Sequence, residues 1–366
     1  MKSLLLLGGG HAHAALLFKL IAAPLTGARV TLVTPKPYQT YSGMLPGLVA
    51  GHYRPEEIRI DIAALARRAD AQLVLENAVA LDAARRRATL GGGREIAYDL
   101  ASLNLGSLPN WFGVPGASDF AIPVKPFETF LAAWDGLRAD AAKRLLRIGV
   151  VGAGAGGVEL ALAMRFALAA GGTPAEIVLF SDRPVALPEH APAAQRRIAR
   201  LLSMERVELC VDTRIVRVEA GAVTDARGKR EACDAVLWIG GAAAQPWLRE
   251  SGLGVDGSGF VLVDATLRSV THPEVFAAGD SATLQGAAHP KSGVYAIRHA
   301  SVLEHNLRAT LAGGTLERYV PQKDALALIS IGRKYCLATR GDWTLEGEWL
   351  WRVKDWIDRR WIRRFE

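Results

Sequence analysis

Short apolar runs alternate with glycine-rich turns and helical stretches along this chain, which predicts parallel strands joined by helices. The first such unit covers residues 2–33 and reads as a strand, a glycine turn, a helix over 13–22 and a second strand over 29–33. The same order returns over residues 147–180. This repeated strand-helix-strand pattern predicts an α/β fold with two Rossmann-like domains.

The two turns carry glycines at the spacing of dinucleotide-binding loops. Residues 8–13 read Gly-Gly-Gly-His-Ala-His, and residues 152–157 read Gly-Ala-Gly-Ala-Gly-Gly. The first two glycines of such a turn let the backbone approach a pyrophosphate at the helix N-terminus, and the third permits close packing of helix and strand. The second turn is complete, whereas His13 takes the third position of the first. The sequence therefore predicts two dinucleotide sites, one at Gly8 and Gly10 and one at Gly152, Gly154 and Gly157.

Each unit is followed later by a similar segment, which indicates an internal duplication. Residues 98–109 and 233–246 both contain an acidic residue, an apolar strand, and then glycine and proline. The strand would return the chain to the nucleotide, where Gly106 or Gly240 allows a close backbone approach. A third apolar strand ends in Gly279-Asp280. A carboxylate at the C-terminal edge of a parallel sheet is well placed to accept hydrogen bonds from sugar-like hydroxyls.

The composition agrees with this interpretation and narrows the class of protein to a folded chain without membrane-spanning helices. A chain of 366 residues, 50% hydrophobic and 22% charged, has room for two or three folded modules and is not typical of a disordered protein. The longest apolar runs are too short to span a bilayer, and residues 4–7 indicate a buried strand rather than a signal peptide. The three cysteines are widely separated, which favours a reducing compartment and argues against a redox disulfide.

Together, the two turns and the Gly279-Asp280 motif resemble the pyridine nucleotide-disulfide oxidoreductase superfamily. In that family an FAD domain is interrupted by an NAD(P)H domain and resumes after it. The resemblance implies FAD at residues 8–13, NAD(P)H at 152–157, and a ribityl contact from Asp280. It divides the chain into the first part of the FAD domain (1–115), the NAD(P)H domain (116–250), the second part of the FAD domain (251–315) and a C-terminal α+β segment (316–366).

Shorter segments narrow the resemblance to type II NADH dehydrogenase-like flavoproteins, a branch that also occurs fused in front of selenophosphate synthetase. These segments are residues 41–47, 123–126, 290–298 and 351–360. The resemblance implies hydride transfer from NAD(P)H to FAD and onward reduction of a quinone or another small acceptor. Two alternatives stay open. One is a sulfide:quinone oxidoreductase-like sulfur or selenium flavoenzyme, for which Cys336 is the candidate thiol, and the other is a non-catalytic nucleotide-binding partner.

Hydride transfer requires no protein nucleophile, because the flavin does the chemistry and the protein supplies position and electrostatics. We expect Lys125 or Lys291 as a cation at the flavin pyrimidine end, Glu159 near the nicotinamide and His299 near the isoalloxazine. Asp182 would accept from the ribose 2′-hydroxyl of NADH, whereas neighbouring Arg183 would suit the 2′-phosphate of NADPH. The other expected cofactor contacts are Gly8, Gly10, His11, His13, Thr34, Pro46, Gly106, Gly279, Val294, Gly152, Gly154, Gly157 and Gly240.

The histidines of the first turn do not predict a metal site. Residues at i and i+2 supply half of a zinc site, and the sequence offers no cluster to complete it. A neutral imidazole that donates to a phosphate oxygen or packs beneath the flavin explains His11 and His13 better.

Tryptophans and basic residues interleave over residues 349–365 and predict an amphipathic helix. Its expected apolar stripe comprises Leu350, Val353, Ile357, Trp361 and Phe365. Such a helix is compatible with an anionic membrane surface, with packing on the protein itself, or with a homodimer interface. Nucleic acid is not an expected partner, because no binding motif accompanies the aromatic residues. These features favour a cytoplasmic protein, peripheral on the inner face of the membrane.

Overall fold

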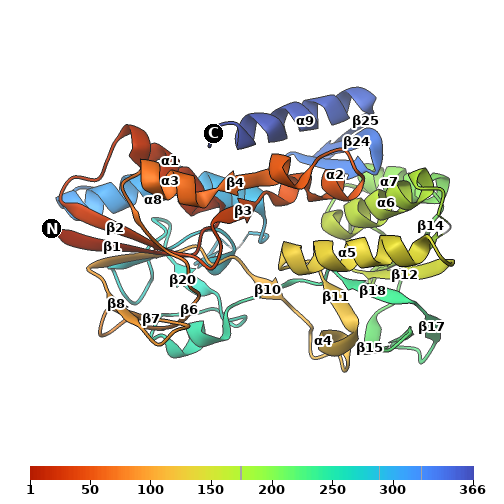
Figure 1. The fold of residues 1–366 in the computed structure, drawn as a ribbon, viewed down its shortest axis with the longest axis horizontal. Coiled ribbons are helices and arrows are strands. Elements are labelled where there is room, and N and C mark those ends of the chain that lie inside the picture. The colour runs from red at the N-terminus through yellow and green to blue at the C-terminus, as the bar shows by residue number, and fades with distance from the viewer. Residues whose placement is uncertain (174, 288, 323) are drawn as a thin grey trace.

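The computed structural model describes residues 1–173, 175–287, 289–322 and 324–366, and two parallel five-stranded sheets form the centres of its two lobes (Figure 1). The first sheet has the order β21 (Val275–Ala277), β9 (Leu100–Leu103), β1 (Lys2–Leu7), β2 (Ala28–Val33) and β5 (Gln72–Val74). The second has the order β11 (Ala121–Pro123), β18 (Ala235–Trp238), β12 (Leu146–Val151), β13 (Ala175–Phe180) and β14 (Val207–Cys210). The predicted α/β class is confirmed.

Helices cover both sheets, so the central strands are buried on both faces and read as continuous apolar runs. The leucines of β1 from Leu4 to Leu7 are at most 1% exposed for this reason. The first lobe carries α1 (His11–Ala22), α3 (Ile62–Arg68) and α8 (Gly293–Ala312). The second carries α5 (Phe127–Ala141), α6 (Ala155–Ala170) and α7 (Pro192–Met204).

The backbone pairing of the two sheets supports the predicted duplication. In the first, Gly8 N–H donates to the Val33 carbonyl at 2.8 Å, and in the second, Gly152 N–H donates to the Phe180 carbonyl at 3.0 Å. The returning strands also end alike, because Asn104 N–H donates to the Leu7 carbonyl and Ile239 N–H donates to the Val151 carbonyl. The duplication therefore gives structural partners: Gly8 corresponds to Gly152, and Asn104 to Ile239.

Smaller elements flank and connect the lobes. The crossing segments between them pair as β10 (Leu108–Pro109) and β19 (Ala242–Ala243) (Figure 1). Antiparallel sheets form from β6 (Ala78–Asp82), β7 (Arg87–Leu90) and β8 (Glu95–Ala97), and from β15 (Ile215–Glu219), β16 (Ala222–Asp225) and β17 (Arg230–Ala232). The remaining elements are β3 (Tyr38–Thr40), η1 (Ser42–Met44), α2 (Leu45–Val49), η2 (Pro55–Ile58), β4 (Arg59–Asp61), α4 (Ala117–Phe120), η3 (Pro246–Glu250), β20 (Val261–Val263), η4 (Gly279–Ser281) and β22 (Ala282–Leu284).

The C-terminal segment forms β23 (Ala327–Ile331), β24 (Arg333–Arg340), β25 (Trp343–Gly347) and α9 (Glu348–Ile362). The helix lies along the top of the view in Figure 1, packed on this small sheet and over α2. Among the described residues, no helix is both long and apolar enough to cross a membrane.

The predicted apolar stripe of this helix is wrong in its phase. Leu350 and Phe365 are buried, but Val353 and Ile357 are each 38% exposed, and the face turned to the protein includes Trp351 and the charged Asp358. Apolar periodicity missed this face because two of its inward residues are a paired lysine and aspartate.

Candidate functional site

The first glycine turn lies against Asn104, at the end of β9. Gly8 has φ +92°, and a Cβ built there would overlap the Asn104 carbonyl oxygen. A Cβ on Gly10 would overlap the Asn104 side-chain oxygen. Both positions therefore exclude a side chain because the segment at Asn104 approaches closely, and the positive φ of Gly8 favours glycine further.

Asn104 is a residue that sequence reasoning missed. Its Oδ1 accepts from the backbone N–H groups of Ala12 at 3.0 Å and His13 at 3.3 Å, and its Nδ2 donates to the Ala278 carbonyl at 2.9 Å. One side chain thus joins the start of α1 to the strand that leads into Asp280. The signal was a polar residue at the end of an apolar strand, where the second copy has Ile239.

His13 fills the position of the missing glycine and hydrogen-bonds within the protein. Its Nδ1 lies 2.6 Å from the Gly8 carbonyl oxygen, so this nitrogen carries the proton, and its Nε2 accepts from the Ser102 hydroxyl at 2.8 Å. Burial lowers its pKa to about 4, so the ring is neutral at pH 7. Because both ring nitrogens are engaged within the protein, packing beneath the flavin is the expected role of His13 that stays a prediction.

His11 stands at the first residue of α1 and is 7% exposed. Its Nε2 has no hydrogen-bond partner among the described residues, and its ring lies 5.5 Å from that of Tyr41. Burial lowers its pKa to about 4. A buried polar nitrogen without a protein partner at a helix N-terminus fits a hydrogen bond to a bound ligand.

Asp280 follows β21 and lies at the C-terminal edge of the first sheet. Its Oδ2 accepts from Ser107 Oγ at 2.9 Å and Lys125 Nζ at 3.0 Å. Burial opposes ionisation of this carboxyl, but the charge of Lys125 and both hydrogen bonds hold its pKa below the ordinary value. The carboxylate is therefore ionised at neutral pH and able to accept hydrogen bonds from hydroxyl groups. Lys125 forms an ion pair with this carboxylate.

His299 lies beneath the Asp280 turn. Its Nδ1 accepts from the N–H of Gly279 at 3.0 Å, and burial lowers its pKa to about 3. Gly279 itself has φ +61°. The imidazole is thus neutral and supports the turn from within α8.

Lys291 contacts two residues of β22. It donates to the Ala282 carbonyl and to Thr283 Oγ1 at 2.8 Å, with its ammonium 4.0 Å from the centre of the Phe260 ring. Burial lowers its pKa to about 8.

The second glycine turn also begins with a glycine of positive φ and also excludes side chains through close backbone contacts. Gly152 has φ +111°, and a Cβ on Gly157 would overlap the Gly152 carbonyl oxygen. Apart from its own chain neighbours, no atom of the described residues lies within 4 Å of a Cβ built on Gly154, so open space adjoins this N-cap residue of α6. Backbone amides beside open space at a helix N-terminus fit a pyrophosphate.

Asp182 and Arg183 follow β13, and their side chains are 61% and 66% exposed. Arg183 Nε lies 4.0 Å from Asp182 Oδ1. Both groups are thus accessible to a ribose bound at the second turn.

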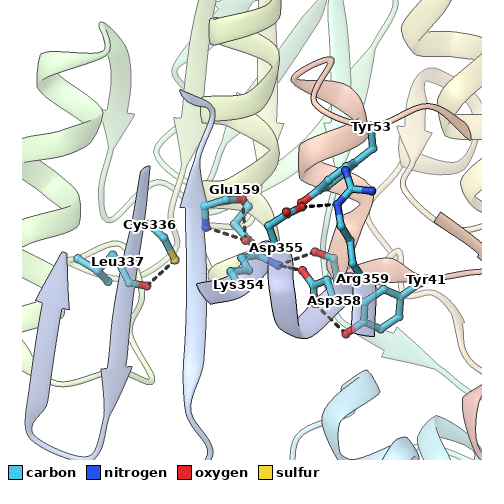
Figure 2. A network of polar contacts seen from close by, with 11 residues as sticks. Tyr41, Tyr53, Glu159, Cys336, Leu337, Lys354, Asp355, Asp358 and Arg359 are labelled. Atoms are coloured by element: carbon cyan, nitrogen blue, oxygen red, sulfur yellow. Dashed lines mark hydrogen bonds and ion pairs between the residues drawn. The ribbon is translucent and has the colours of Figure 1, made fainter. Parts of the chain in front are cut away.

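Glu159 lies in a network of polar contacts between α6 and the C-terminal segment (Figure 2). Its Oε1 accepts from the backbone N–H of Ser330 at 2.9 Å and from the Ser330 hydroxyl at 3.0 Å. Burial raises its pKa, although the charge of Lys354 opposes the shift. The side chain therefore connects α6 to β23.

The other predicted cofactor residues are dispersed around the two turns. Thr34 is buried next to Gly9, Pro46 is buried in α2, and Val294 is 40% exposed in the first turn of α8. Gly106 has φ +74° with open space beside it. Gly240 packs against Trp238 and Phe112.

The described residues also include three cysteines and several residues of the types that bind metals. Cys210, Cys233 and Cys336 are free thiols, and burial raises the pKa of Cys336 to about 12. No group of three or more His, Cys, Asp or Glu side chains is arranged to hold a metal in the described part of the chain.

A family model described as "Pyridine nucleotide-disulphide oxidoreductase" matches residues 2–301. The NADH dehydrogenase-like protein YutJ of Bacillus subtilis is 24% identical over 344 residues, covering 91% of each chain. The type II NADH:quinone oxidoreductase NdhA of Mycobacterium tuberculosis is 28% identical over 242 residues, which cover 58% of this chain and 52% of that protein.

Two solved structures have the same fold. NDH2 of Plasmodium falciparum in complex with NADH superposes with a TM-score of 0.86 at 14% identity, covering 100% of this chain and 97% of that one. The sulfide:quinone oxidoreductase of Aquifex aeolicus gives 0.85 at 17% identity, covering 100% and 91%.

Proposed function

Because this chain belongs to the pyridine nucleotide-disulphide oxidoreductase family, we propose that it is an FAD-dependent NADH dehydrogenase that passes electrons to a quinone or another small acceptor. The observation that carries the proposal is the pairing of two glycine turns on equivalent edges of two sheets with equivalent strand order. The relatives named as NADH dehydrogenase-like and type II NADH:quinone oxidoreductase support the same activity.

The residues around the first turn are suited to holding FAD. FAD, when bound, supplies the hydride acceptor and stores the electron pair. Gly8 and Gly10 give the pyrophosphate access to the N-terminus of α1. Asp280 accepts hydrogen bonds from the ribityl hydroxyl groups. Lys125 keeps that carboxylate ionised. His11 Nε2 offers a further buried hydrogen bond.

The second turn would hold the nicotinamide nucleotide. Gly152 and Gly157 keep its pyrophosphate at the start of α6, and open space at Gly154 provides room. Exposed Asp182 favours NADH by accepting from the 2′-hydroxyl. We assign Glu159 the role of holding a proton at the junction of α6 and β23, since burial favours its neutral form.

The alternative of a thiol-dependent sulfur or selenium flavoenzyme has less support. Such an enzyme needs thiolates, and the raised pKa of Cys336 keeps that sulfur protonated. Cys210 ends β14 of the second sheet, and Cys233 lies between β17 and β18.

Anaerobic titration with NADH and NADPH tests the proposal. The purified protein should be yellow, and its flavin absorbance should bleach with one equivalent of NADH and more slowly with NADPH. Subsequent addition of a soluble quinone should restore the colour. A colourless protein that FAD does not reconstitute would instead support the non-catalytic nucleotide-binding alternative.

We also propose that the outer face of α9 contacts an anionic membrane surface, on the cytoplasmic side. This face carries Trp349 and Trp356, 54% and 59% exposed, together with Val353 and Ile357. Exposed arginines flank it at positions 352, 360, 363 and 364. Tryptophans beside arginines match the interfacial region of an anionic bilayer.

Replacing Trp349 and Trp356 together by Ser should reduce cosedimentation with phosphatidylglycerol vesicles several-fold. Phe120→Ser is a matched control, because Phe120 is 50% exposed on α4, on the opposite side of the molecule (Figure 1). Equal sedimentation of both variants would contradict the membrane contact. Salt-independent self-association that is lost in the tryptophan variant would instead assign this face to a homodimer.

A further inference from the structure

The inner face of α9 reaches a segment of the first lobe far away in sequence. Lys354 Nζ donates to the Gly43 carbonyl at 2.7 Å and to Asp358 Oδ2 at 2.7 Å. Asp358 Oδ1 accepts from the Tyr41 hydroxyl at 3.1 Å. Figure 2 shows Tyr41, Lys354 and Asp358 converging from the helix and the loop. Two residues of the C-terminal helix thus hold residues 41–43 through two hydrogen bonds, and the bond between Lys354 and Asp358 joins the two anchors.

Residues 41–43 adjoin the start of both helices at the first glycine turn. The ring of Tyr41 lies 5.5 Å from that of His11, the first residue of α1. A Cβ built on Gly293, the first residue of α8, would lie 3.6 Å from both Ser42 Oγ and His11 Cδ2. The segment therefore packs where α1 and α8 begin, beside the His11 nitrogen that has no partner among the described residues.

The contacts between α9 and this segment are buried and charged. The side chains of Lys354 and Asp358 are 12% and 6% exposed. Glu159 is a second buried carboxyl near Lys354, and burial raises the pKa of both Asp358 and Glu159. Burial alone would lower the pKa of Lys354, but the charges of these two acidic groups hold it above its ordinary value. A buried ion pair contributes little net stability, because the cost of desolvating both charges offsets their attraction. Removing one partner is nevertheless costly, since the other charge is left buried and uncompensated.

We propose that Lys354 and Asp358 are positioning residues for the flavin, so that α9 completes the FAD site and is more than a membrane-binding element. They act through Tyr41 and Gly43, which hold the side of the proposed FAD site where His11 lies. The inference rests on the proposed function, specifically on FAD occupying the first turn.

The same helix contains a matched control. One residue further along the helix in each case, Asp355 accepts from the Tyr53 hydroxyl at 2.8 Å and from Arg359 Nε at 2.9 Å, and Arg359 also donates to Glu57 at 2.9 Å. This second network also ties α9 to the first lobe (Figure 2). Its partners are Tyr53 and Glu57, not residues 41–43.

The test compares Lys354→Met and Asp358→Asn with Arg359→Met in the FAD-loaded protein. The first two should raise the FAD dissociation constant about tenfold and shift the flavin midpoint potential measured by dithionite titration, whereas Arg359→Met should leave both unchanged. Thermal unfolding of all three measures the structural cost separately. Tyr41→Phe removes one hydroxyl group and no charge, so it should shift the flavin potential by a smaller amount. This variant replaces Lys354→Met in the comparison if Lys354→Met does not fold.

Wild-type potential and FAD affinity in Asp358→Asn and Tyr41→Phe would overturn the inference, as would equal shifts in Arg359→Met. Dithionite reduction needs no nicotinamide nucleotide. The result is therefore distinguishable from failure of the proposed function, which would appear as a wild-type protein that binds no FAD or is not reduced by NADH.

Discussion

Asp280→Ala should yield protein that loses FAD on desalting, with a dissociation constant raised about a hundredfold. The carboxylate is ionised and aimed by Ser107 and Lys125. Hydrogen bonds to a charged group contribute about 1.5–3 kcal/mol each, so the loss of one or two ribityl contacts corresponds to this effect. The measurement is the ratio of flavin to protein absorbance after desalting, followed by fluorescence titration of the apoprotein with FAD.

Two further variants identify the cause. Asp280→Asn keeps the shape but replaces one acceptor oxygen by an amide donor, so an intermediate loss is expected. Lys125→Met leaves the acceptor in place and should weaken FAD binding less than Asp280→Ala. Undiminished FAD retention in Asp280→Ala would contradict the assignment of Asp280 and, with it, the junction between the two parts of the FAD-binding lobe.

The sequence predicted those parts of the fold that depend on local backbone chemistry. Gly152 and Gly157 were recognisable because a left-handed turn and a close helix-strand contact each exclude a side chain. The run of leucines in β1 was interpretable because a parallel strand covered on both faces has no polar side. Repetition then made two weak motifs into one strong prediction.

The role of His13 could not be predicted from the motif, because it depends on a partner from another strand. In the second turn Gly157 packs on the Gly152 carbonyl, whereas in the first turn the corresponding Gly8 carbonyl accepts a hydrogen bond from His13. The imidazole thus replaces van der Waals contact by a hydrogen bond to the same group. Ser102 on β9 completes this arrangement, and nothing near residue 13 in sequence indicates it.

Long-range polar contacts also account for the errors at the C-terminus. Hydropathy periodicity assigns lysine and aspartate to solvent, but Lys354 and Asp358 face inward because Gly43 and Tyr41 supply their partners. The inward turn of these residues exposes Val353 and Ile357. Asn104 escaped detection for a similar reason, since its three hydrogen-bond partners lie on α1 and before η4.

Gly157→Ala should strongly slow reduction of the flavin by NADH while leaving FAD bound. A Cβ at this position overlaps the Gly152 carbonyl oxygen, which is backbone and cannot move without separating α6 from β12. Such overpacking costs about 1–3 kcal/mol or more, and the displaced turn no longer presents its amides to the pyrophosphate. Anaerobic stopped-flow absorbance should show flavin reduction slowed about a hundredfold or more, and the flavin-to-protein ratio should stay at the wild-type value.

Gly156→Ala is the matched control, one residue earlier in the same helix. The nearest atom to its added Cβ is Ile239 Cγ2 at 3.7 Å, an ordinary contact. Replacing a helical glycine by alanine where space exists stabilises a protein by about 0.4–1 kcal/mol through the unfolded state. This variant should therefore melt at or above the wild-type temperature and retain rapid reduction by NADH. Equal loss of activity in both variants would mean that crowding at the α6 N-terminus, rather than contact between Gly157 and Gly152, limits nucleotide binding, and wild-type rates in Gly157→Ala would place the NADH site elsewhere.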